Sequence, residues 1–180
     1  MNLFSQKKEK ANRELIEQIL LEKYNQYYQL AYGYAHSRED AFDIVQSGAC
    51  RAMKNSHTLK QPEYAKTWIY RIMLNECFEY LKQPKHFSFE AVQDKNETEM
   101  GAAEDQYMDI DLHKALNALG DKDRAVIILK YFEDRKISEI AEILEENVNT
   151  VKSRLYRSMR KLQVLLSDGE VERNGEEYEE

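Results

Sequence analysis

The sequence contains little that could build a cross-linked, metal-bound or membrane-spanning protein. Its 180 residues include only two cysteines, Cys50 and Cys77, and these lack the paired Cys and His spacing of a zinc site. Four scattered histidines add no ligand cluster. No apolar run approaches the roughly 18 residues that cross a membrane, and the first residues lack the apolar core of a signal peptide. We therefore expect a globular protein, cytoplasmic by default, without metal or cofactor.

Proline and glycine are also scarce, with two and six copies, so long segments run without a helix breaker. Apolar residues recur every three or four positions from Leu15 to Tyr34, which predicts one long amphipathic helix. Ser37 resembles a helix start, and Pro62 suits the first turn of a third helix. Because no strand pattern has a second strand to pair with, the sequence predicts an all-α fold. It shows no nucleophile with a base and no phosphate loop, so an enzyme is disfavoured.

Acidic residues outnumber basic ones, giving a net charge of −7, but the acids are concentrated in two segments. Residues 90–111 hold 8 acids and one lysine, and residues 167–180 hold 7 acids and one arginine. The first is typical of a linker and the second of a solvated tail. We therefore predict two small helical domains, residues 1–84 and 108–166, joined by a flexible acidic linker at 85–107 and followed by an acidic tail at 167–180.

The second domain contains the pattern of a helix-turn-helix. From Ser138 the sequence predicts two short helices joined by a tight turn. Residues 149–162 of the second helix hold five cations and no acid. Helical spacing puts Val151, Leu155, Ser158 and Leu162 on one buried stripe. Cationic and hydrogen-bonding side chains occupy the opposite face, as expected for a helix that contacts phosphates and base edges.

These motifs resemble a known family. SEIAEILEENVNTVKSRLYRSMRKL is similar to region 4.2 of bacterial extracytoplasmic-function (ECF) sigma factors of the sigma-70 family, which reads the promoter −35 element. EDAFDIVQSGACRAM resembles region 2.2, which docks on core RNA polymerase. AKTWIYRIMLNECFEYLKQ resembles regions 2.3 and 2.4, which open and read the −10 element. The sequence departs from the family pattern at Gly48 in the docking helix, which costs about 1 kcal/mol relative to alanine in a helix, and at Glu145, where glycine is common in the turn.

The resemblance implies roles for three sets of residues. For the −35 element it implies phosphate contacts and base contacts, with Tyr156 open to either role; the set is Asn149, Thr150, Lys152, Ser153, Arg154, Tyr156, Arg157 and Arg160. Within it, Lys152, Arg154 and Arg160 are expected at phosphates, and Asn149, Ser153 and Arg157 at bases. For the −10 element it implies a loop that holds a flipped base and a neighbouring helix; the set is Asn55, Ser56, His57, Lys60, Lys66, Trp68, Tyr70, Arg71 and Asn75. Composition alone favours Trp68 and Tyr70 as core residues instead.

For the polymerase-facing surface the resemblance implies Asp40, Asp43, Ile44 and Gln46, in which the acids oppose a basic clamp and Ile44 supplies apolar contact. The implied partners are core RNA polymerase, promoter DNA and an anti-sigma factor, often membrane-anchored. The sequence also leaves two other interpretations: a stand-alone helix-turn-helix regulator that binds DNA without polymerase, and a helical scaffold protein.

Overall fold

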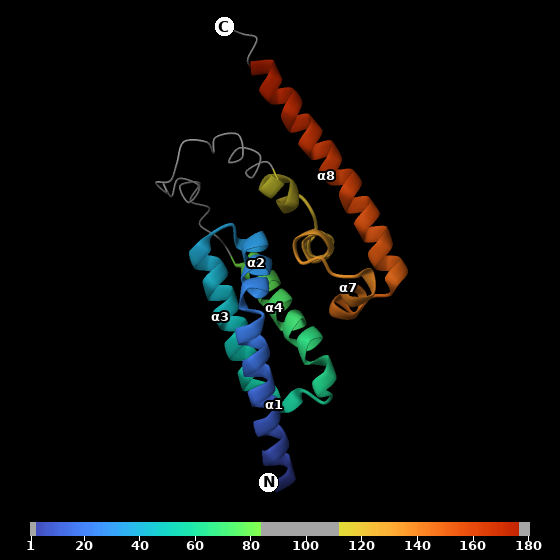
Figure 1. The fold of residues 1–180 in the computed structure, drawn as a ribbon. Coiled ribbons are helices and arrows are strands. Elements are labelled where there is room, and N and C mark those ends of the chain that lie inside the picture. Colours follow the sequence, from blue (N-terminus) through green and yellow to red (C-terminus); the bar gives the residue numbers. More distant parts are fainter. Residues whose placement is uncertain (1–2, 84–111, 177–180) are drawn as a thin grey trace.

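The protein is helical throughout the part that the structure describes. The computed structural model describes residues 3–83 and 112–176, and no strand occurs among them. Four helices before the gap form a bundle, and the later helices lie along one side of it (Figure 1). The predicted all-α class is confirmed. The predicted linker at 85–107 lies entirely outside the described residues, and the domain limits stay predictions.

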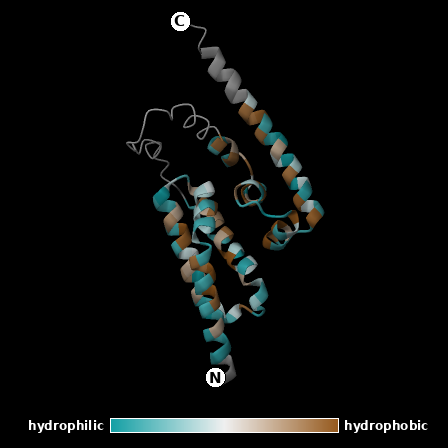
Figure 2. Cartoon of the chain, in the orientation of Figure 1, coloured by the Kyte–Doolittle hydropathy of each residue, from teal (hydrophilic) through white to brown (hydrophobic). Residues whose placement is uncertain are grey.

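The N-terminal bundle consists of α1 (Leu3–Glu22), α2 (Tyr24–Ala35), α3 (Arg38–Lys54) and α4 (Ala65–Lys82). Two short 3-10 turns, η1 (Ser56–Thr58) and η2 (Pro62–Tyr64), lie between α3 and α4. Figure 2 shows both apolar and polar residues on each of these helices, as amphipathic packing requires. The apolar sides meet in a core that includes Ile16, Tyr27 and Ile69, all 0% exposed.

The helix ends differ from the sequence prediction at two places. The predicted single helix through Leu15 and Tyr34 is interrupted at Lys23, whose φ of −107° and ψ of 13° are not helical. Pro62 lies in the separate turn η2, and α4 begins only at Ala65. The predicted start at Ser37 is confirmed, because its Oγ accepts a hydrogen bond from the Asp40 N–H at 3.3 Å.

The C-terminal module starts with helical residues 112–117. It continues with α6 (Asp121–Ile127), the single π-helical turn η4 (Ile128–Phe132), α7 (Ile137–Leu144) and α8 (Val148–Glu176). Figure 1 shows α8 as a long helix that leaves the module at its C-terminal end. It therefore continues through much of the segment that the sequence predicts as a solvated tail.

Gly48 is explained by close packing of α3 against α4. A Cβ atom at this position would lie 2.4 Å from the Sδ atom of Met73, and Met73 is 1% exposed. No side chain fits there unless the core shifts. The glycine therefore allows α3 and α4 to approach closely, a packing role that its cost to the helix does not reveal.

The two modules pack directly against each other. Gly33 of α2 contacts η4 so closely that an added Cβ would lie 2.8 Å from Cδ1 of Ile128. The Tyr34 hydroxyl donates to the Asp121 carbonyl at 3.1 Å. One continuous hydrophobic core includes buried residues of both modules, among them Leu30, Ile69, Ile128 and Leu129. The chain thus adopts a closed arrangement in which α2 and α4 face η4 and α7.

Candidate nucleic-acid interface

The turn between α7 and α8 depends on a left-handed residue. Glu145 has φ 55° and ψ 41°, and the next residue, Glu146, donates its N–H to the Ala141 carbonyl at 3.0 Å. Glycine takes this conformation readily, whereas another residue pays roughly 1–2 kcal/mol. The turn at Glu145 therefore has the left-handed shape that glycine, the common residue at this position, would adopt.

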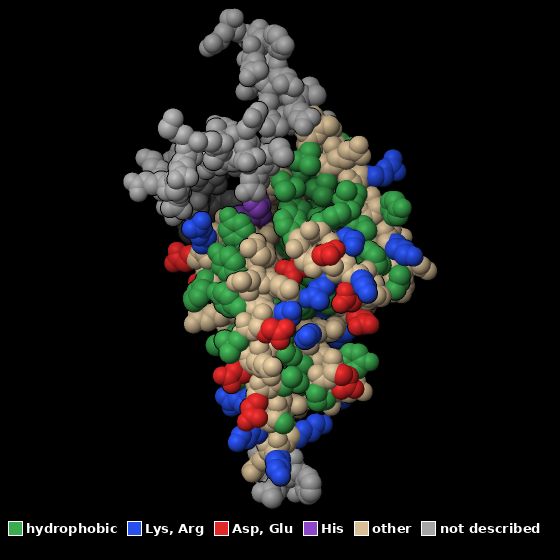
Figure 3. Space-filling view, in the orientation of Figure 1, with side chains coloured by type: hydrophobic (Ala, Val, Ile, Leu, Met, Phe, Trp, Pro, Cys, Tyr) green, Lys and Arg blue, Asp and Glu red, His purple; other side chains and the backbone are tan. Residues whose placement is uncertain are grey.

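Helix α8 presents two chemically different faces, as the sequence predicts. Val151, Ser158 and Leu162 are 0%, 1% and 6% exposed. Leu155 is partly buried and packs against the hydrophobic core and against a second, smaller cluster of apolar side chains. Six predicted −35 residues are exposed: Asn149, Lys152, Ser153, Tyr156, Arg157 and Arg160. Basic side chains are visible along the edge of the molecule that α8 forms (Figure 3). This exposed face can meet a polyanion without unfolding the module.

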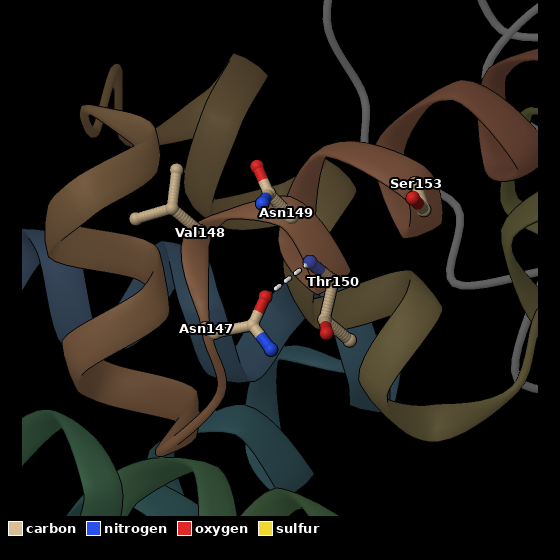
Figure 4. A pocket seen from close by; sticks show the side chains of 5 residues that line it. All are labelled: Asn147, Val148, Asn149, Thr150 and Ser153. Atoms are coloured by element: carbon tan, nitrogen blue, oxygen red, sulfur yellow. Dashed lines mark hydrogen bonds between the residues drawn. The ribbon is translucent and has the colours of Figure 1, made fainter.

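A hollow of about 620 Å³ lies at the N-terminal end of α8. Figure 4 shows its lining, in which Asn147 caps the helix by accepting a hydrogen bond from the Thr150 N–H at 2.8 Å. Asn149 and Ser153, one turn apart, add an amide and a hydroxyl. The first N–H groups of a helix carry partial positive charge, so this end favours phosphate oxygens or electronegative base edges.

Arg154 is held within the protein more tightly than its neighbour Arg157, whose Nη2 also lies 3.2 Å from Asp123 Oδ1. The Nη1 of Arg154 lies 2.6 Å from Asp123 Oδ1, and its Nε lies 2.8 Å from Glu146 Oε2. Its side chain is 24% exposed, and the two carboxylates are 20% and 11% exposed. Hydrogen bonds from Arg154 lower the pKa of Glu146, and Lys122 adds to that effect. The predicted phosphate contact is therefore replaced, in this arrangement, by an ion-pair cluster that fastens α8 to α6 and to the turn.

Three of the nine predicted −10 residues line a second hollow of about 370 Å³. Lys60, Trp68 and Arg71 line it together with Tyr64 and neighbouring polar residues of the loop. Trp68 is partly buried, so it both packs on the core and lines the hollow. His57, Lys66 and Asn75 are exposed outside this lining, and Asn55 is half-buried. The loop and α4 therefore form the hollow together. Tyr64 of η2 also lines it, and the sequence did not predict any residue of η2 there.

Two members of the predicted −10 set are buried instead. Ser56 and Tyr70 are each 1% exposed, so neither side chain can reach a base in this structure. Ser56 lies in η1, against α1. The Tyr70 hydroxyl accepts a hydrogen bond from Arg135 Nη2 at 2.6 Å and lies 3.0 Å from Glu133 Oε2. Tyr70 is thus a core residue at the contact between the modules, and burial raises its pKa.

Arg71 connects the hollow to the helix-turn-helix. Its Nη2 donates to the Glu142 carbonyl at 2.6 Å, and its Nη1 lies 2.7 Å from Glu145 Oε1. Glu142 itself lines the hollow. In the closed arrangement, Arg71, which the sequence predicts to contact DNA, is therefore bound instead by residues of α7 and of the turn after it.

Two family models match the chain. "Sigma-70 region 2" matches residues 20–86, and "Sigma-70, region 4" matches residues 109–162. The RNA polymerase sigma factor SigV of Bacillus subtilis is 36% identical over an alignment that covers 89% of this chain and 96% of SigV. The chain belongs to the sigma-70 family. The ECF RNA polymerase sigma factor SigW of the same organism is 30% identical, covering 78% and 83% of the two chains, so the chain is an ECF-type member.

A solved structure supports the same fold. The sigma factor RpoE of Bartonella quintana, crystallised with the anti-sigma factor NepR, superimposes with a TM-score of 0.62 and 25% sequence identity. The match covers 84% of this chain and 96% of RpoE. Among the described helices of this chain, none is both long enough and apolar enough to span a membrane, and within those same residues no cluster of three or more His, Cys, Asp or Glu side chains could hold a metal ion.

The third predicted set, which the resemblance assigns to the polymerase-facing surface, is only partly exposed. Asp43 and Gln46 are exposed, and the Oδ2 of Asp40 accepts a hydrogen bond from the Tyr80 hydroxyl at 2.7 Å. Ile44 is 5% exposed and belongs to the core, whereas Phe42 is 51% exposed beside Asp43. Phe42 is thus the exposed apolar residue beside Asp43, and the prediction did not name it. The helical period of α3 indicates this difference, because Ile44 lies on the same face as buried Ala41 and Gly48, whereas Phe42 does not.

Proposed function

We propose that this sigma factor directs core RNA polymerase to promoters by reading a −35 element with the exposed face of α8 and a −10 element with the hollow between the loop at residues 55–61 and α4. The observation that carries this proposal is the exposed face of α8, where an amide and a hydroxyl line the N-terminal hollow and exposed cations follow along the same helix. Chemistry is left to the polymerase, and we assign the protein to the cytoplasm because promoters are transcribed there.

The −35 element fits α8 by charge and by hydrogen-bonding chemistry. Lys152 and Arg160 are exposed cations suited to phosphates, which position a protein on duplex DNA. Asn149 and Ser153 line the hollow, where an amide and a hydroxyl can meet base edges in the major groove. Arg157 has a side chain that is 65% exposed and donors for a bidentate contact to guanine, which would replace the present pairing of its Nη2 with Asp123 Oδ1 at 3.2 Å.

Replacing Arg157 with alanine should lower affinity for a cognate −35 duplex by about 1–3 kcal/mol and relax preference at one base pair. Lys152→Ala is the matched control, because a lost phosphate contact should weaken cognate and scrambled duplexes alike and reduce the salt slope by about 1. Fluorescence anisotropy on a set of single-base variants at two salt concentrations measures both effects. Equal loss of base preference from both substitutions would contradict the assignment.

The second hollow suits a single unpaired base. Trp68 and Tyr64 provide aromatic surface, and stacking of a base on an aromatic ring contributes about 1–3 kcal/mol. Lys60 and Arg71 supply positive charge beside it. In the closed arrangement Arg71 contacts Glu142 and Glu145, so engagement of −10 DNA requires this contact to break.

We propose that the surface of α3 that carries Phe42, Asp43 and Gln46 binds the polymerase. Phe42 supplies exposed apolar area, and Asp43 supplies charge for a basic clamp. The closed arrangement leaves this surface accessible, so polymerase can bind before the modules separate.

Reversing the charge at Asp43 should weaken binding to core polymerase by about 2–3 kcal/mol, because like charges across an interface cost several kcal/mol. Phe42→Ala should cost about 1–2 kcal/mol through lost apolar contact. Glu17→Arg, which makes the same charge change at an exposed position of α1, should leave affinity within about 0.5 kcal/mol. Titration of labelled protein with core polymerase gives the three affinities; an Asp43→Arg variant that binds as tightly as Glu17→Arg would exclude this surface.

We further propose that an anti-sigma factor, often membrane-anchored in this family, holds the protein inactive. The support is the similarity to RpoE, which was crystallised with an anti-sigma factor.

Run-off transcription with core polymerase, with and without this protein, tests the proposed function as a whole. Stimulation that depends on both promoter elements supports the sigma function. Duplex binding without stimulation would instead indicate a stand-alone helix-turn-helix regulator, and the absence of both would indicate an interaction protein.

A further inference from the structure

One buried polar side chain of α1 holds the backbone of the loop that forms the −10 hollow. Asn12 is 3% exposed. Its Nδ2 donates to the Ser56 carbonyl at 3.0 Å and to the Leu59 carbonyl at 2.9 Å. Both acceptors belong to residues that are themselves buried, at 1% and 3% exposure. Water therefore cannot easily replace these bonds, and an unpaired carbonyl there would be costly.

The chemistry of this contact is specific to a side-chain amide. Both partners of Asn12 are carbonyl oxygens, which only accept hydrogen bonds, so the NH2 group must face them. Its two hydrogens match the two acceptors. An apolar residue offers no donor, a carboxylate offers only oxygens, and a hydroxyl satisfies one carbonyl at most.

One of these carbonyls comes just before the segment that lines the hollow, and the other lies within that segment. This segment includes Thr58, Leu59 and Lys60, which line the hollow opposite Trp68 of α4. Lys8, one helical turn before Asn12, adds a second contact, because its Nζ lies 3.4 Å from the Lys60 carbonyl. Helix α1 thus holds the backbone of the loop at Ser56, Leu59 and Lys60.

We propose that Asn12 is a positioning residue for −10 recognition: it never touches DNA, but it sets the shape of the loop that receives the base. The inference rests on the proposed function and adds a specificity role for α1. Asn12 lies outside residues 20–86, the segment matched by the region 2 family model, and so belongs to none of the motifs that carry the family resemblance.

The test compares Asn12→Ala with Ile16→Val in the full-length protein bound to core polymerase. Ile16 is 0% exposed and lies one turn after Asn12 on the same side of α1, so its truncation weakens the packing of α1 but leaves the loop hydrogen bonds. Open-complex formation is measured on an intact promoter and on promoters with single-base changes in the −10 element. Binding to a −35 duplex and to polymerase is measured in parallel.

For Asn12→Ala we expect open-complex formation on the intact promoter to fall about tenfold, the loss that corresponds to a hydrogen-bonded carbonyl left unpaired. Its discrimination among −10 variants should shrink, while −35 and polymerase binding stay within about twofold. Asn12→Ser keeps one donor and should give an intermediate loss; it also serves as the test if Asn12→Ala does not fold. Ile16→Val should retain full discrimination at a similar decrease in melting temperature.

Loss of −10 discrimination that follows melting temperature equally in the Asn12 and Ile16 variants would overturn the inference, because the role would then be structural only. Full discrimination in both Asn12→Ala and Asn12→Ser would overturn it as well. If the unsubstituted protein showed no dependence on the −10 element, the proposed function itself would fail, and the inference would fail with it.

Discussion

Replacing Arg154 with alanine should lower the free energy of unfolding by about 2–3 kcal/mol. This is at or below the roughly 3–5 kcal/mol that follows when one partner of a buried ion pair is removed, because the three side chains are 11–24% exposed. The substitution leaves the carboxylates of Asp123 and Glu146 facing each other without the guanidinium that joins them. Lys122, 2.9 Å from Glu146, and Arg157, 3.2 Å from Asp123, compensate only in part. Chemical denaturation followed by circular dichroism measures the change.

Arg160→Ala is the control that separates stability from DNA contact, since Arg160 is exposed on the same helix. It should leave the unfolding free energy within about 0.5 kcal/mol but reduce the salt slope of DNA binding by about 1. Equal stability of the two variants, together with an equal loss of salt dependence, would show that Arg154 faces a phosphate and that its ion pairs contribute nothing.

Faces of helices were predictable from the sequence because burial follows the helical period. Val151, Ser158 and Leu162 are buried at the positions that the period of α8 requires, and the cations lie opposite. Phe42 and Ile44 show the limit of motif-based prediction, since Ile44 was assigned to a surface although its phase places it in the core. At Ile44, where the helical period and the family motif predicted different environments, the structure follows the helical period.

Contacts between residues far apart in the sequence were not predictable in the same way. From the sequence, a basic side chain on α8 could contact a phosphate or form an ion pair within the protein. Only the fold shows that Asp123 lies beside Arg154. Gly48 appeared as a defect in a helix until Met73 was found against it. Asn12 carried no signal at all, because a single asparagine in an amphipathic helix gives no indication that two loop carbonyls lie next to it.

The packing of the two modules against each other has a direct consequence for promoter binding. The −35 and −10 elements are centred about 25 base pairs apart, which is about 85 Å at 3.4 Å per base pair. In the closed arrangement Arg71 of the −10 hollow contacts Glu145 in the turn before the −35 helix. If α8 and the second hollow read the two elements as proposed, one closed molecule cannot occupy both, and simultaneous recognition requires the contact between η4 and α2 to open.

A reversible lock across this contact should therefore abolish transcription while preserving −35 binding. An added Cβ at position 33 would lie 3.4 Å from Cγ1 and 3.8 Å from Cγ2 of Ile128, the two atoms bonded to the Ile128 Cβ. Gly33→Cys with Ile128→Cys therefore places two thiols near each other for a disulfide, which needs Cβ atoms about 3.5–4.5 Å apart. The exposed Cys50 is changed to serine, and Cys77, 0% exposed, is kept. Oxidation should reduce the run-off transcript roughly tenfold or more, because a locked closed state cannot shift its population towards the open one.

The exposed face of α8 separates this outcome from simple inactivation. It remains exposed when the modules are closed, so the oxidised protein should bind a −35 duplex within about twofold of the reduced form. Addition of reductant should then restore transcription, and the two single-cysteine variants should not respond to oxidant. A fully cross-linked protein that transcribes normally would mean that the modules read the promoter without separating, and the contact of Arg71 with the helix-turn-helix would then have to be part of the active state.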